Sequence, residues 1–219
     1  MNDFDSENPS ENEWEEQGDL AWNEFDWERY LREQDEAIHR YLGYYEAFKD
    51  NPDRIDLVAE QMGWGQSEDD DKAPDAEAKD EDFSPSEEIY TLHKNPVFIS
   101  TKAIYLGLRR RWELAANDAA RVPQSIAISY LSALHRGEDN ANQAIHALDF
   151  GDYAMAVCLF KRALGALNDS LAFLGGSAEK HKAIAAYREQ SLSRLFDLRE
   201  IWLRVITECR EELKRPMEE

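Results

Sequence analysis

Long segments in which large apolar residues recur every three or four positions constrain the fold of this chain more than any other feature. The clearest segment carries Val157, Phe160, Leu164, Leu167, Leu171 and Leu174. This spacing places the side chains on one face of an α-helix. No segment alternates apolar and polar residues for long enough to predict a β-strand. The sequence therefore predicts an all-α fold.

The same periodicity predicts four long helices in the second part of the chain. Their expected ranges are 97–119, 123–149, 152–174 and 178–214. We expect Gly175 and Gly176 to end the third helix, Ser177 to cap the fourth, and Gly137 to weaken the middle of the second. Because the connections are short, the helices should pack as a four-helix antiparallel bundle over residues 86–215.

The first part of the chain is strongly acidic. Residues 1–90 contain 30 Asp and Glu against 7 Lys and Arg, whereas residues 91–219 contain 16 against 18. We expect an acidic, partly disordered arm over residues 1–65 with an amphipathic helix over 26–50, followed by an acidic disordered linker over 66–85. Such an arm repels nucleic-acid phosphates and anionic lipids, so we expect no nucleic acid and no membrane as partner. A protein with a basic surface is the complementary partner.

Aromatic residues alternate with acids in this arm and are the predicted partner-binding residues. They are Trp14, Trp22, Phe25, Trp27 and Tyr30. An aromatic anchor can enter a groove while the carboxylates meet arginines around its rim.

Arginines suited to such a rim recur in the last predicted helix. Arg188, Arg199 and Arg210 are eleven residues apart and lie within a narrow sector of that helix. The groove belongs either to the body of this chain or to another protein. We therefore expect a non-enzymatic helical interaction or adaptor protein that binds protein partners.

A short stretch resembles one unit of a tetratricopeptide repeat. Gly151-Asp152-Tyr153 is followed by Ala156, Phe160 and Ala163, which is similar to the turn and second helix of that family over residues 137–164. The resemblance implies helix pairs that stack sideways and form a concave surface for extended peptides. No similar turn occurs about 34 residues away on either side. A closed bundle would argue against such a stack.

A polar stripe supports an alternative of a different class. His135, Asp139, Asn142 and His146 are spaced by four, three and four residues, on one helix face. Imidazole and carboxylate groups in this pattern can bind zinc or iron, so the alternative is a metal-dependent helical-bundle enzyme or metal-binding protein that uses His135, Asp139 and His146. No second helix supplies a matching pair, and polar residues are also expected beside an apolar stripe. We therefore expect no cofactor.

Two further expectations concern location and assembly. The first residues contain no basic segment followed by an apolar one, and no run approaches the ~18 apolar residues of a membrane span, so we expect a cytoplasmic protein. The last predicted helix has more apolar positions than one neighbour covers. We therefore expect that copies of the chain can associate through this helix as a homo-oligomer.

Overall fold

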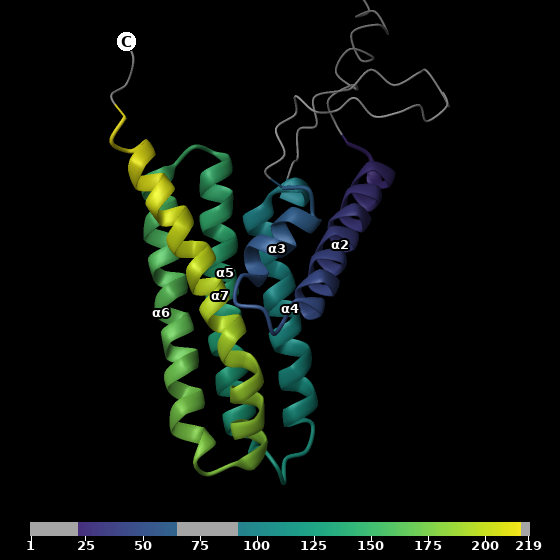
Figure 1. Ribbon diagram of the computed structural model, residues 1–219, viewed down its shortest axis with the longest axis vertical. Helices are drawn as coiled ribbons and strands as arrows, with labels where there is room; N and C mark the ends of the chain where they lie inside the picture. Colours follow the sequence, from purple (N-terminus) through teal and green to yellow (C-terminus); the bar gives the residue numbers. More distant parts are fainter. Residues whose placement is uncertain (1–21, 65–91, 216–219) are drawn as a thin grey trace, which may run out of the picture.

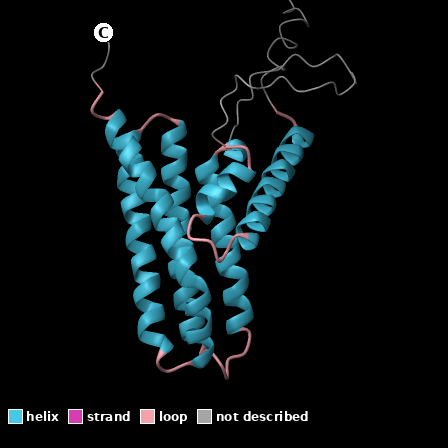
Figure 2. Cartoon of the chain, in the orientation of Figure 1, coloured by secondary structure: helices cyan, strands magenta, loops and turns pink. Residues whose placement is uncertain are grey.

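The computed structural model describes residues 22–64 and 92–215. In these two ranges every regular element is helical, as Figure 2 shows, so the all-α prediction is confirmed. The elements are α2 (Glu24–Ala47), α3 (Arg54–Gln61), the 3₁₀-helix η2 (Leu92–Lys94), α4 (Pro96–Ala116), α5 (Gln124–Asp149), α6 (Tyr153–Ala178) and α7 (Lys182–Glu212). Trp14 and the predicted linker 66–85 lie outside the described residues.

The four long helices α4 to α7 form a closed bundle. Consecutive helices run in opposite directions and pack on each other, and α7 returns to pack on α4 (Figure 1). This is the up-down-up-down arrangement expected from short connections. A repeat stack would leave the first and last helices apart, so the likeness to a tetratricopeptide repeat is limited to the turn between α5 and α6.

That turn has a local explanation in Gly151 and Asp152. Gly151 has φ +72°, a left-handed conformation that glycine adopts without strain just after a helix ends. The Asp152 side chain then accepts a hydrogen bond from the backbone N–H of Met155 at 2.9 Å and caps the start of α6. Glycine after a helix end and aspartate at a helix start are common in tight connections between helices, so this turn does not by itself indicate a repeat.

The predicted boundary between the last two helices is wrong. α6 continues through Gly175 and Gly176 to Ala178, and α7 begins at Lys182 after an extended His181, so Ser177 is not its cap. Neither glycine has a positive φ, which a glycine that ends a helix usually adopts. Each glycine costs about 1 kcal/mol relative to alanine inside a helix, a cost that packing of the fully buried Leu174 can offset.

Aromatic side chains fill the bundle interior. Trp202 on α7 is fully buried, packs against Tyr105 with ring centroids 6.1 Å apart, and donates its indole N–H to the Thr101 hydroxyl at 3.1 Å. Trp112 on α4 is also buried, and its ring lies 4.4 Å from that of Tyr130. The Trp112 indole N–H donates to the Ala127 carbonyl at 3.1 Å, so both buried indole groups have polar partners as well as apolar neighbours.

Gly137 has a packing role instead of being only a weak point. A Cβ atom built at this position would lie 2.4 Å from the Tyr105 hydroxyl, which is too close for any side chain. Glycine lets α5 and α4 approach each other at the level of Tyr105. The cost of glycine inside a helix is thus linked to a close contact between helices.

α2 and α3 pack onto the bundle and share its core. Tyr41 and Tyr45 of α2 and Val58 of α3 are fully buried in the same apolar cluster as the bundle residues. α2 contacts α4, η2 and α3, and a Cβ at Gly107 of α4 would lie 3.3 Å from Leu42 of α2. Residues 24–61, named the α2–α3 hairpin below, therefore dock directly on the bundle.

Candidate docking sites

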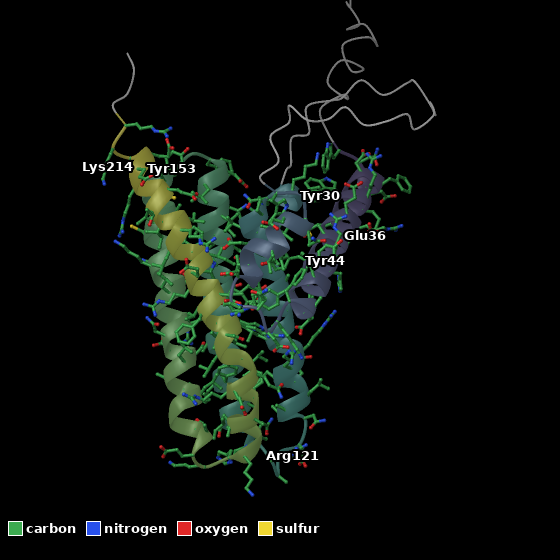
Figure 3. All side chains as sticks on the ribbon, viewed as in Figure 1. Tyr30, Glu36, Tyr44, Arg121, Tyr153 and Lys214 are labelled. Carbon is green, nitrogen blue, oxygen red and sulfur yellow. The ribbon has the colours of Figure 1, made fainter. Side chains whose placement is uncertain are left out.

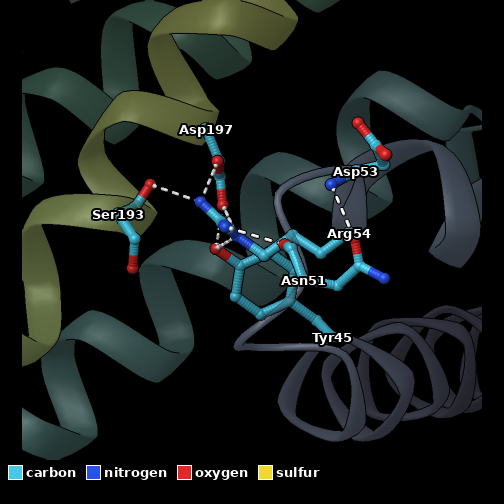
Figure 4. Close-up of polar contacts among 6 residues, drawn as sticks. All are labelled: Tyr45, Asn51, Asp53, Arg54, Ser193 and Asp197. Atoms are coloured by element: carbon cyan, nitrogen blue, oxygen red, sulfur yellow. Dashed lines mark hydrogen bonds and ion pairs between the residues drawn. The ribbon is translucent and has the colours of Figure 1, made fainter.

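A buried polar cluster fixes the α2–α3 hairpin to α7 (Figure 4). The Arg54 guanidinium of α3 donates two hydrogen bonds of 2.6 Å to the two carboxylate oxygens of Asp197. The Tyr45 hydroxyl of α2 donates to the same carboxylate. The Asp197 side chain is buried and the Arg54 side chain is 12% exposed, so their desolvation must be offset by these paired hydrogen bonds. Three helices thus meet at one carboxylate.

Burial and neighbouring charges shift the pKa values of Tyr45 and Arg54 in this cluster. Burial raises the pKa of the Tyr45 hydroxyl well above its ordinary value, and the negative charge of Asp197 raises it further. Burial by itself would lower the pKa of the Arg54 guanidinium, but the hydrogen bonds to Asp197 and Tyr45 raise it. The Tyr45 hydroxyl is therefore neutral and the Arg54 guanidinium is charged near neutral pH.

A second polar contact joins the end of α2 to α4 and α7. The Glu46 carboxylate accepts a hydrogen bond of 2.5 Å from Arg194 and one of 2.7 Å from Arg111. Burial by itself would raise the pKa of Glu46, but these hydrogen bonds and positive charges lower it. Arg194 is buried and also faces the Tyr45 ring, with 5.3 Å between the guanidinium carbon and the ring centroid. An acidic residue of α2 is thus held between two arginines of the bundle.

Two adjoining hollows lie between α4 and α7, and the first also borders the turn between α2 and α3. The first is a polar cavity of about 350 Å³, lined by Lys49, Asp50, Arg111, Glu189, Gln190, Ser193 and Arg194. The second is a more apolar hollow of about 280 Å³ between α4 and α7, named the α4–α7 groove below. Arg111 and Gln190 line both. The groove therefore continues the surface on which the hairpin docks.

The first turns of α2 carry aromatic and apolar side chains at the surface. Asn23 caps the helix, accepting from the N–H groups of Phe25 and Asp26 while Asp26 accepts from the Asn23 N–H. Phe25 is 76% exposed and Leu31 is 49% exposed. Trp22, Trp27 and Tyr30 form edge-to-face pairs with ring centroids 5.0 to 6.0 Å apart. Residues 22–31, named the α2 tip below, thus hold four of the five predicted partner-binding aromatics, of which Tyr30 is buried.

The predicted arginine rim does not meet this tip. Arg188, Arg199 and Arg210 are exposed along α7, and in the described ranges no hydrogen bond or ion pair joins them to the hairpin. The bundle arginines that contact the hairpin are Arg110, Arg111, Arg194 and Arg204, while Arg54 of the hairpin itself pairs with Asp197. Sequence reasoning missed Arg54, Arg194 and Asp197 as a group, because their pairing joins residues about 140 positions apart. The one available signal was a charged residue, Arg194 or Asp197, inside the apolar stripe of α7.

The polar stripe of α5 lies at the surface. His135, Asp139 and His146 are exposed, and Asn142 is half-buried. Across residues 22–64 and 92–215, no three His, Cys, Asp or Glu side chains are grouped so that they could hold a metal ion. The stripe therefore gains no ligand from a neighbouring helix in this part of the chain.

The chain matches no protein-family model, no curated protein and no solved structure. Among the described helices, none combines the length and the apolar character needed to span a membrane. Function must therefore be argued from the surfaces of this chain.

Proposed function

We propose that the protein is a non-enzymatic helical adaptor that binds a partner protein through the α2 tip. The observation that carries this proposal is the exposure of Phe25 and Leu31 on a helix end rich in acids. In Figure 1 the start of α2 stands away from the bundle, whereas its end lies against α4. A partner could therefore reach this end of the helix from several sides.

The chemistry of the α2 tip indicates what the partner offers. Glu24, Glu28 and Asp35 are exposed on the same helical sector as Trp27 and Leu31. Large apolar side chains anchor interfaces, while surrounding carboxylates steer a basic partner and set its orientation. The proposed partner is a protein with an apolar pocket that is bordered by lysine or arginine.

The test is a quantitative pull-down from lysate of the native host with the full-length chain as bait. The double variant F25A/W27A removes the anchors, and F150A is the matched control because Phe150 is 86% exposed between α5 and α6. Proteins captured by the wild type and F150A should be lost with the double variant, and high salt should weaken their capture. Equal capture by all three baits, or capture that salt does not change, would refute the proposal.

A further inference from the structure

The α4–α7 groove has an apolar floor and a basic rim. Its floor and walls are formed by Leu114, Ala115, Ala183, Ala186 and Tyr187. Arg111 and Arg121 stand at its rim, and no acidic side chain of the described residues lines it. Leu114, a large apolar residue near the end of α4, is 72% exposed. The groove is thus suited to an apolar anchor that is flanked by carboxylates.

The α2–α3 hairpin shows how acidic segments bind to this surface. Gly107 of α4 faces α2, and helical periodicity places Ala103 and Leu114 on the same face of α4. Leu114 lies beyond the end of α2. Arg111 at the near edge of the groove already binds Glu46. Arg121 at the far edge makes no ion pair in the described ranges. The groove therefore extends an established intramolecular interface and leaves one arginine available.

The N-terminal sequence of the chain has the complementary composition. Residues 1–21 contain eight acidic residues and no lysine or arginine. Within them, Glu11, Glu13, Glu15 and Glu16 flank Trp14. One large aromatic residue surrounded by four carboxylates matches an apolar floor with two arginines at its rim.

Chain length decides which copy of the chain can supply Trp14. Glu46, which contacts the near edge of the groove, lies 22 residues along α2 from Glu24, or about 33 Å at 1.5 Å per residue. The eight residues from Trp14 to Trp22 span at most about 29 Å when fully extended. Figure 3 likewise shows Tyr30 of α2 and Arg121 of the groove near opposite ends of the molecule. Trp14 of the same chain therefore falls short of the groove.

We propose that the α4–α7 groove binds the Trp14 segment of a second copy of this chain. Two copies placed side by side in opposite directions bring each N-terminus to the other copy's groove. The exchange is then reciprocal and closes as a two-fold dimer. This inference does not depend on the partner of the α2 tip, because it uses different residues of the chain.

The experiment is photo-crosslinking of the full-length chain with benzoylphenylalanine in place of Trp14. This chain is mixed with ¹⁵N-labelled wild-type chain, irradiated and analysed by mass spectrometry. We expect a crosslinked dimer in which the unlabelled N-terminal peptide is joined to labelled peptides from 111–121 or 183–190. Absence of a dimer, crosslinks within one chain only, or crosslinks to another surface of the partner would each overturn the proposal.

A pair of matched variants of the labelled chain tests the groove itself. L114E places a negative charge on the groove wall, whereas I128E makes the same change at an exposed position of α5, where Ile128 is 59% exposed. L114E should reduce the yield of crosslinked dimer about tenfold or more, because it disrupts an apolar contact of the interface. I128E should leave this yield unchanged. An equal yield with both variants would overturn the proposal. Circular dichroism establishes that both variants are folded.

Discussion

The bundle and the α2–α3 hairpin share one apolar core, but different contacts hold each in place. Within α4 to α7, stacked aromatic rings and close helix approaches are prominent, as at Trp202 and Gly137, and one buried carboxylate, Glu138 of α5, accepts from Arg109 and Lys102 of α4. The hairpin adds charged groups brought together from distant parts of the sequence, at Asp197 and at Glu46. A buried ion pair is destabilised when one partner is removed or titrated, whereas apolar packing contains no titratable group. The two regions should therefore respond differently to mutation and to solution conditions.

The largest loss of stability is expected from a substitution in the bundle core. Trp202→Ala removes a fully buried ring and should lower the free energy of unfolding by about 3–5 kcal/mol. Because the hairpin shares this core, both regions should lose stability together. Urea unfolding followed by circular dichroism measures the change.

The neighbouring Leu203 provides the control for this experiment. It is partly exposed, so Leu203→Ala should change the free energy of unfolding by less than about 1 kcal/mol. If both variants had similar effects, Trp202 would not be part of the central core.

Asp197→Ala should cause a smaller loss of stability, and this loss should be concentrated in the α2–α3 hairpin. This change leaves the Arg54 charge and the Tyr45 hydroxyl without their partner and should cost about 2–3 kcal/mol, below the range for a fully buried pair because Arg54 is partly hydrated. Hydrogen exchange should show reduced protection over residues 24–61 while α6 remains protected.

The exposed ion pair between Asp56 and Arg204 is the matched control. Asp56→Ala breaks a contact of 2.6 Å that lies in solvent and should cost less than about 1 kcal/mol. If Asp197→Ala lowered protection equally in α6 and in the hairpin, the two regions would form a single cooperative unit and the distinction between them would fail.

The smallest effect concerns pH and Glu46. A carboxylate whose pKa is lowered by folding stabilises the folded state above its unfolded pKa, and this contribution is lost as the pH falls through the folded pKa. Since an unfolded glutamate has a pKa of about 4.3, the loss should begin below about pH 4.3. Glu46 is partly hydrated. We therefore expect the free energy of unfolding of the wild type to be only about 1 kcal/mol larger than that of Glu46→Gln at neutral pH.

Urea unfolding of both proteins at pH 7 and near pH 3 measures this difference, which should shrink toward zero in acid. Glu113→Gln, at an exposed position of α4, is the control for removing one negative charge from this acidic protein. A difference between the wild type and Glu46→Gln that stays constant with pH would show that the carboxylate charge does not hold the hairpin.

Much of the helical architecture could be predicted from the sequence because its signals are local. Apolar spacing located α4 to α7 to within a few residues, except at the boundary between α6 and α7. Gly151 and Asp152 marked the turn between α5 and α6 through their own backbone and capping chemistry. At Gly175 and Gly176 the same local rule failed, since their residue type alone does not reveal whether φ is positive.

The candidate sites were less predictable because they depend on contacts between distant residues. The sequence located the aromatic residues of the α2 tip and the charge imbalance between the two parts of the chain. Which arginines meet the hairpin was decided by the tertiary structure, which selects Arg54, Arg111 and Arg194 over Arg188, Arg199 and Arg210. Helical periodicity specifies the face on which a side chain lies, but the neighbour of that face is set only when the helices pack. The sequence by itself therefore determined the helices and their charge, and the packing of α4 against α7 determined where the α4–α7 groove lies.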